Sequence, residues 1–137
     1  MAELTQADVD AKKLIDQYDL TAIVEDTRKQ QNWDEARAKD AERWYKNFLF
    51  MCYLDRNHPL LVLGQDADKV WHTHLETSRY RDDCMTLVGA YVNHQPTPGK
   101  PPTRQQRADT NERCKKLFDA DAPDLLVHCI APPPPLN

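Results

Sequence analysis

The residues best suited to chemistry are three histidines within 23 positions, His72, His74 and His94. Neutral imidazole is the commonest protein ligand for zinc, iron or copper, and two imidazoles with one carboxylate form the metal site of many zinc and non-haem iron proteins. Asp68 supplies a carboxylate one helical turn before His72. The cluster therefore predicts a divalent transition-metal site, of zinc, iron or copper, held by these four residues, with Cys84 as an alternative donor.

The spacing of His72 and His74 leaves two geometries open for this site. Each residue of an α-helix advances by about 100°, so the two side chains point about 200° apart on a regular helix. In the first geometry, His74 points into a cleft and meets His94. In the second, the helix starts late, and both histidines converge with Asp68 on one ion from an irregular segment.

A helical wheel over this segment separates the two histidines between its faces. His74 lies on the apolar face, with Val70, Trp71, Ser78 and Met85. His72 lies on the polar face, with Asp68, Glu76 and Asp83. A buried histidine usually satisfies a hydrogen-bond partner and a surface one often forms an ion pair, so a structural role for both is the competing hypothesis.

Three further residues near the histidines could take part in catalysis. An open metal position would activate water or dioxygen, with Tyr80 or Asp83 as proton carrier, in oxidation or hydrolysis of a small-molecule or peptide substrate. Alternatively, Cys84 could be a thiolate nucleophile with His74 or His94 as its base. Trp71 and Tyr80 are expected to line the site.

A non-catalytic function is the alternative from another class. In a protein-interaction module, the histidines and Asp68 would stabilise the fold by hydrogen bonds without metal. The protein partner would then dock on exposed aromatic residues or on the prolines at 132–135.

Composition excludes several other functions. A net charge of −4 over 137 residues provides no basic face for the phosphates of nucleic acid, so no nucleic-acid partner is expected. No apolar stretch approaches the roughly 20 residues of a membrane span, and the first residues do not resemble a secretory signal, so a cytoplasmic protein without membrane contact is predicted. The four cysteines contain no CxxC pair, which argues for free thiols over a zinc finger.

The distribution of apolar residues and prolines predicts an all-α fold, a single compact domain of five or six helices with little sheet. This helical domain covers 1–131, its histidine region spans 66–96, and a proline-rich tail follows at 132–137. Thr5 is expected to cap a helix at 6–18, Asp34 to cap an aromatic-rich helix, and Asp66 to cap a helix reaching about 92. A proline-rich loop at 95–103 precedes a charged helix at 104–118.

The order of these side chains resembles the WHxH…YxxDC…HxP signature of the plant glycine-rich domain-containing proteins and their uncharacterised bacterial relatives. The matching residues are Asp68, Trp71, His72, His74, Thr77, Tyr80, Asp83, Cys84, Gly89, His94 and Pro96. The aromatic segment at 45–53 is similar to a helix that precedes the signature in that family. The resemblance implies no particular reaction, and with only three glycines this chain lacks the glycine-rich segment of the plant proteins.

Overall fold

The computed structural model describes residues 4–55, 60–93, 95, 96, 103–120, 123 and 129–131. Six helices in these ranges confirm the all-α prediction: α1 (Gln6–Gln17), α2 (Thr21–Gln31), α3 (Glu35–Leu54), α4 (Gln65–Leu75), α5 (Tyr80–Leu87) and α6 (Arg104–Phe118). Residues 56–59, most of the predicted proline-rich loop and the tail at 132–137 lie outside the described residues.

Side-chain caps set the starts of three helices. Thr5 forms a capping box with Asp8 at the start of α1, and Thr103 forms one with Gln106 at the start of α6. The Asp34 side chain accepts a hydrogen bond from the backbone N–H of Arg37 at the start of α3. These bonds satisfy backbone donors that have no partner inside the helix, and they confirm the predicted caps of α1 and α3.

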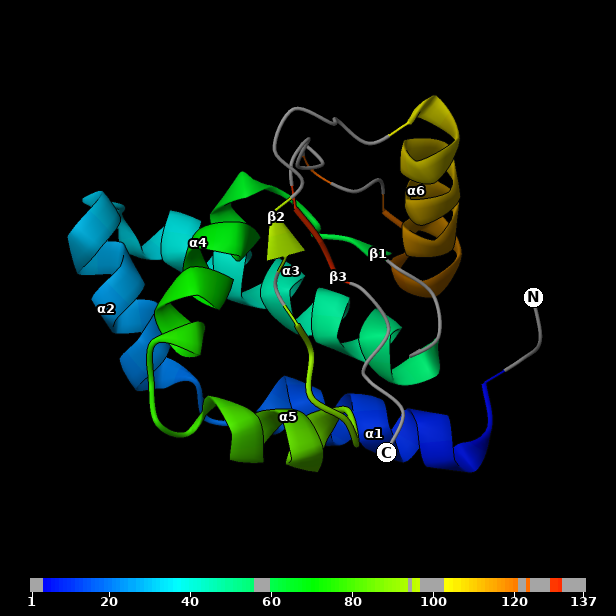
Figure 1. The fold of residues 1–137 in the computed structure, drawn as a ribbon, viewed down its shortest axis with the longest axis horizontal. Helices are drawn as coiled ribbons and strands as arrows, with labels where there is room; N and C mark the ends of the chain where they lie inside the picture. The colour runs from blue at the N-terminus through cyan, green and yellow to red at the C-terminus, as the bar shows by residue number, and fades with distance from the viewer. Residues whose placement is uncertain are drawn as a thin grey trace.

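The prediction of one continuous helix up to about 92 is wrong, because the chain breaks between α4 and α5. The Thr77 hydroxyl donates to the His74 carbonyl oxygen at 2.7 Å, where a helix would place a backbone N–H from the next turn. Helix α5 begins at Tyr80, three residues after Thr77, and runs in a different direction (Figure 1). Helix α4 starts at Gln65 after Gly64, whose φ of 105° suits glycine. The N-cap of α4 is therefore Gly64 and not Asp66, the residue predicted from the sequence.

Helix α3 forms the centre of the molecule and contacts α1, α2, α4 and α5 (Figure 1). Every residue from Trp44 to Cys52 is buried, so this stretch of α3 passes through the core with no face toward solvent. The Phe48 ring lies 4.9 Å from the Trp71 ring of α4, between ring centroids. The heavy aromatic content of this segment therefore has the core role that the sequence predicted.

A small sheet joins the remaining segments. Strand β3 (Cys129–Ala131) pairs antiparallel with both β1 (Leu60–Leu61) and β2 (Gln95–Pro96), and it lies between them. Helix α6 packs against β1. Within the part of the chain that the structure describes, no helix is long and apolar enough to cross a membrane.

Candidate functional site

His74 lies in the core, with both ring nitrogens hydrogen-bonded. Its side chain is 1% exposed, Nε2 lies 2.7 Å from Asp83 Oδ2, and Nδ1 lies 2.7 Å from the Tyr45 hydroxyl. An ionised carboxylate only accepts hydrogen bonds, so Nε2 carries the proton. A neutral ring then has a lone pair on Nδ1, which accepts from Tyr45.

Asp83 accepts three side-chain hydrogen bonds. The Tyr18 hydroxyl donates to Oδ1 at 2.5 Å, and Arg79 Nε donates to Oδ2 at 2.6 Å beside His74. Burial alone would raise the pKa of Asp83, but the hydrogen bonds from Tyr18, His74 and Arg79 and the charge of Arg79 hold it below its ordinary value. The carboxylate is therefore kept ionised.

Arg79 supplies the compensating charge, and so His74 can stay neutral. Its Nη2 also donates to the backbone carbonyl of Asp19 at 2.9 Å, which fixes the guanidinium next to the carboxylate. Burial lowers the pKa of His74, and this effect exceeds the opposing hydrogen bond and charge of Asp83. Neutral imidazole is the form that fits the observed hydrogen bonds.

These five residues, Tyr18, Tyr45, His74, Arg79 and Asp83, form what we call the His74 network. They come from the end of α1, from α3, from α4 and from the start of α5. The bonds Tyr18–Asp83, Tyr45–His74 and His74–Asp83 each join two of these segments. The fourth bond, between Arg79 and Asp83, stabilises the first turn of α5. The network therefore ties four helices together at one point.

The wheel placed Asp83 on the polar face and Met85 on the apolar face, and the structure contradicts both. Asp83 is 4% exposed and Met85 is 53% exposed. On one continuous helix, the nine positions from His74 to Asp83 would put the two side chains on opposite faces. The break after α4 reorients α5, so that Asp83 faces His74 and Met85 faces outward.

Tyr80 lies beside His74, and Trp71 is hydrogen-bonded to Tyr80. The Tyr80 ring meets the His74 ring edge to face at 4.9 Å. The Tyr80 hydroxyl accepts from Trp71 Nε1 at 2.8 Å and donates to the Val92 carbonyl at 2.5 Å. Burial is the main reason why the pKa of Tyr80 is raised well above its ordinary value, so its proton stays on the hydroxyl.

Of the proposed metal ligands, the structure brings His72 and Asp68 together but does not bring His74 to them. His72 is on the same helix as His74 but is 53% exposed, and its Nε2 lies 3.1 Å from Asp68 Oδ2. Helix α4 is regular from Gln65, which excludes the irregular approach of the second geometry. His94 lies outside the described residues, and among those described no three His, Cys, Asp or Glu side chains are placed to hold a metal ion.

Cys84 is 2% exposed and belongs to the hydrophobic core, as does Tyr80. Burial is the largest influence on its pKa and raises it, so the thiol form is favoured over the thiolate that a nucleophile requires. Cys52 and Cys114 are buried as well, and all three are free thiols. Burial raises the pKa of Cys114 to about 12.

Sequence analysis missed three members of the network, Tyr18, Tyr45 and Arg79. Tyr45 carried a usable signal, since a tyrosine hydroxyl in the middle of an aromatic helix needs a buried polar partner and His74 was the polar group predicted on an inner face. Arg79 lies four residues before Asp83, the spacing of a helical ion pair. Tyr18 is 65 positions from Asp83, and nothing local indicates their contact.

Comparisons with known proteins identify no relative. No protein-family model, curated protein or solved structure matches the chain. The resemblance to the plant glycine-rich domain-containing proteins therefore stays a hypothesis that rests on the signature residues themselves.

Proposed function

We propose that this chain is a non-catalytic protein-interaction module and that the His74 network is its structural centre. The observation that supports this is the state of His74, which is 1% exposed and uses both ring nitrogens in hydrogen bonds to Tyr45 and Asp83. A ligand or a general base needs a free nitrogen lone pair that faces its target. The only lone pair of this ring faces the Tyr45 hydroxyl.

The predicted catalytic residues also have structural partners. Tyr80 donates to a backbone carbonyl, Asp83 accepts from three side chains, and Cys84 is buried with a raised pKa. A proton carrier or nucleophile must reach substrate, and each of these three residues is at most 4% exposed. Their arrangement favours stabilisation of the fold over catalysis.

Metal binding by His72, His74, His94 and Asp68 is the competing proposal. It requires His74 to give up a hydrogen bond to Tyr45 or Asp83, and it requires His72 to leave the outer face of α4. The described residues do not fit a shared ion in their present geometry, since His72 and His74 point to opposite sides of one helix. We therefore derive no chemical step through a metal.

Elemental analysis combined with thermal unfolding separates the two proposals. The wild-type chain, purified without chelator, is compared with His74→Gln, His94→Ala and His72→Gln, the last as an exposed control on the same helix. We expect less than stoichiometric zinc, iron or copper in every sample, a clear loss of stability for His74→Gln, and little change for His72→Gln. Near-stoichiometric metal that disappears in both His74→Gln and His94→Ala would instead establish the metal proposal.

Affinity purification from the source cells tests the interaction itself. The proposal expects a defined protein partner that is enriched equally by the wild type and by His72→Gln. Failure to enrich any protein over an unrelated control of the same size and charge would count against an interaction module.

A further inference from the structure

The exposed large hydrophobic residues of the described chain gather beside α1. They are Leu4, Leu14 and Met85, which are 39%, 44% and 53% exposed. Leu4 lines a hollow of about 690 Å³ between α1, the end of α3 and α6. Leu14 and Met85 line a second hollow of about 540 Å³ between α1, the end of α3 and α5.

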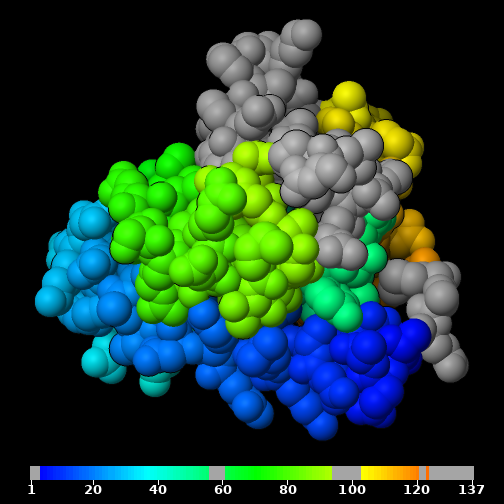
Figure 2. All heavy atoms as spheres, turned by 60° about the horizontal axis from the view of Figure 1, so that its bottom comes forward, coloured from blue at the N-terminus to red at the C-terminus, as the bar shows by residue number. Residues whose placement is uncertain are grey.

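The two hollows form one surface, because Asp8 and Leu54 line both of them. We call this surface the α1 groove. Figure 2 shows α1 in blue along one edge of the molecule, with the green α5 region beside it and the teal end of α3 emerging between them. The large apolar residues of the groove that are at least partly exposed are Leu4, Leu14, Tyr53, Leu54, Met85 and Leu117.

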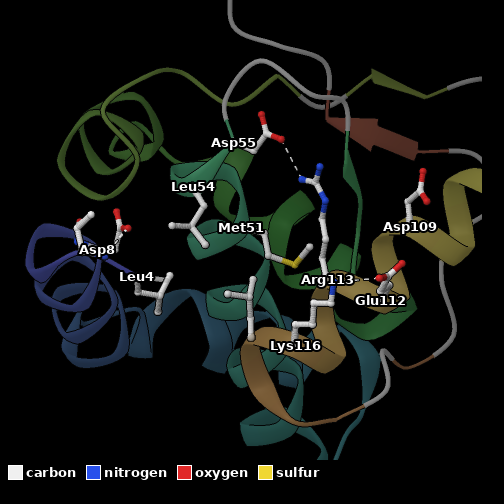
Figure 3. A pocket seen from close by; sticks show the side chains of 11 residues that line it. Leu4, Asp8, Met51, Leu54, Asp55, Asp109, Glu112, Arg113 and Lys116 are labelled. Carbon is white, nitrogen blue, oxygen red and sulfur yellow. Dashed lines mark hydrogen bonds and ion pairs between the residues drawn. The ribbon is translucent and has the colours of Figure 1, made fainter. Parts of the chain in front are cut away.

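Acidic side chains surround this apolar strip. Five carboxylates, those of Asp8, Asp10, Asp55, Asp109 and Glu112, line the groove with only two cations, Arg113 and Lys116, which leaves a net charge of −3. Figure 3 shows four of the acidic residues placed around Leu4, Met51 and Leu54. The groove therefore carries most of the net charge of −4 of the whole chain.

The two cations are both paired with carboxylates of the groove, so they neutralise two of its five acidic side chains and leave the net charge of −3. Arg113 Nη1 lies 3.0 Å from Asp55 Oδ2, and Lys116 Nζ lies 3.0 Å from Glu112 Oε1. Asp10 and Asp109 accept hydrogen bonds from the neutral amides of Gln6 and Gln105. The negative charge of these two residues, on opposite sides of the groove, therefore remains uncompensated by those partners.

We propose that the α1 groove docks a basic amphipathic segment of a partner protein, a helix with leucine-type side chains along one face and lysine or arginine beside them. This inference rests on the proposed interaction function and names its surface and the chemistry of its partner. The apolar strip of the groove would contact the leucine-type side chains of the partner helix. The carboxylates at the margins of the groove would pair with the lysine or arginine side chains of that helix. A second copy of the chain does not fit, because the same groove on both copies would oppose like charges.

Fluorescence anisotropy with a defined probe tests the inference. The probe is a labelled 18-residue peptide of leucine and lysine with leucines on one helical face, and the matched control peptide has glutamate in place of lysine. We expect the 137-residue chain to bind the lysine peptide and not the glutamate peptide. Binding should weaken as salt concentration rises, because the charges at the margins are exposed.

Charge-reversal variants locate the binding. Asp10→Lys with Asp109→Lys reverses both sides of the groove, whereas Asp26→Lys with Asp40→Lys makes the same charge change at exposed positions of α2 and α3 outside it. We expect the groove variant to weaken binding by roughly tenfold or more, and the control variant by about twofold or less. Leu14→Ser and Met85→Ser should also weaken it without a change of charge, and circular dichroism verifies that each variant is folded.

Three results would overturn the inference. They are equal weakening by the two charge variants, equal binding of the glutamate peptide, and concentration-dependent self-association of the chain in sedimentation that the groove variant abolishes. Failure here is distinct from failure of the proposed function. A partner captured equally by the wild type and the groove variant would leave the interaction module in place and move its surface elsewhere.

Discussion

His74 Nε2 donates to Asp83 Oδ2 at 2.7 Å across the break between α4 and α5. The two residues are nine positions apart, and they meet only because the chain leaves the helical path of α4 at Thr77. The same bond therefore depends on the local break and holds the two helices in the orientation that the break creates. Its partners Tyr45 and Arg79 extend this link to α3 and to the first turn of α5.

Asp83→Asn should destabilise the fold by about 2 to 4 kcal/mol, since it removes the charge of a buried carboxylate that accepts three side-chain hydrogen bonds. The amide would keep an acceptor for Tyr18, but its NH2 group would face the donors of His74 and Arg79. Urea unfolding measures the loss, and Asp82→Asn, at the exposed neighbouring position, is the matched control. Equal effects of the two substitutions would contradict a structural role for the network.

Tyr45→Phe removes one hydroxyl and leaves His74 Nδ1 buried without its donor. An unsatisfied buried acceptor costs about 1 to 3 kcal/mol, while the volume of the ring is retained. Tyr53→Phe on the same helix is the control, because Tyr53 is only half-buried. The free energy of unfolding is again the quantity to compare, and an unchanged value for Tyr45→Phe would show that Nδ1 has no need of this bond.

Much of the fold follows from the sequence because its signals are local. Thr5 and Asp34 are caps, the aromatic residues of α3 repeat on the period of a helix, and 104–118 has no proline. The break after α4 was missed, although Thr77 and Ser78 are adjacent residues whose hydroxyls compete for helix carbonyls. The apolar pattern of the sequence keeps the period of a helix across these residues, because the turn between α4 and α5 is only four residues long.

The site was harder to predict than the fold because its bonds join distant segments. The histidine cluster was interpreted as a metal site, which stays a prediction, whereas the helical wheel correctly separated the buried His74 from the exposed His72. Which partner His74 meets depends on the packing of α1, α3 and α5 around α4. Composition and spacing cannot determine that Tyr18 and Tyr45 supply hydroxyl groups there, as both lie at least 29 positions from their partners.

Stability should depend on pH through His74. The pKa of His74 is lowered in the folded state by burial, from an ordinary value of 6.5, so the unfolded chain binds the proton more readily. The contribution of the neutral ring is therefore fully present above about pH 6.5 and is lost as the pH falls toward the lower folded-state pKa. Urea unfolding between pH 7.5 and 5 should show decreasing stability for the wild type, and a smaller decrease for His74→Gln.

His72→Gln is the control for this measurement, because the exposed ring at this position lies outside the His74 network. Its stability should follow the wild-type pH dependence. A His74→Gln variant with the full wild-type slope would assign the pH dependence to other groups.

The buried cysteines should react slowly with alkylating reagents while the chain is folded. Cys52, Cys84 and Cys114 are each at most 5% exposed, and burial raises the pKa of all three thiols. Alkylation requires an accessible thiolate, so at neutral pH each should be modified only through opening of the fold. A Cys129→Ser background limits the measurement to these three residues, and labelling in denaturant gives the reference rate. Rapid modification of Cys84 alone in the native protein would instead revive the hypothesis that it is a nucleophile.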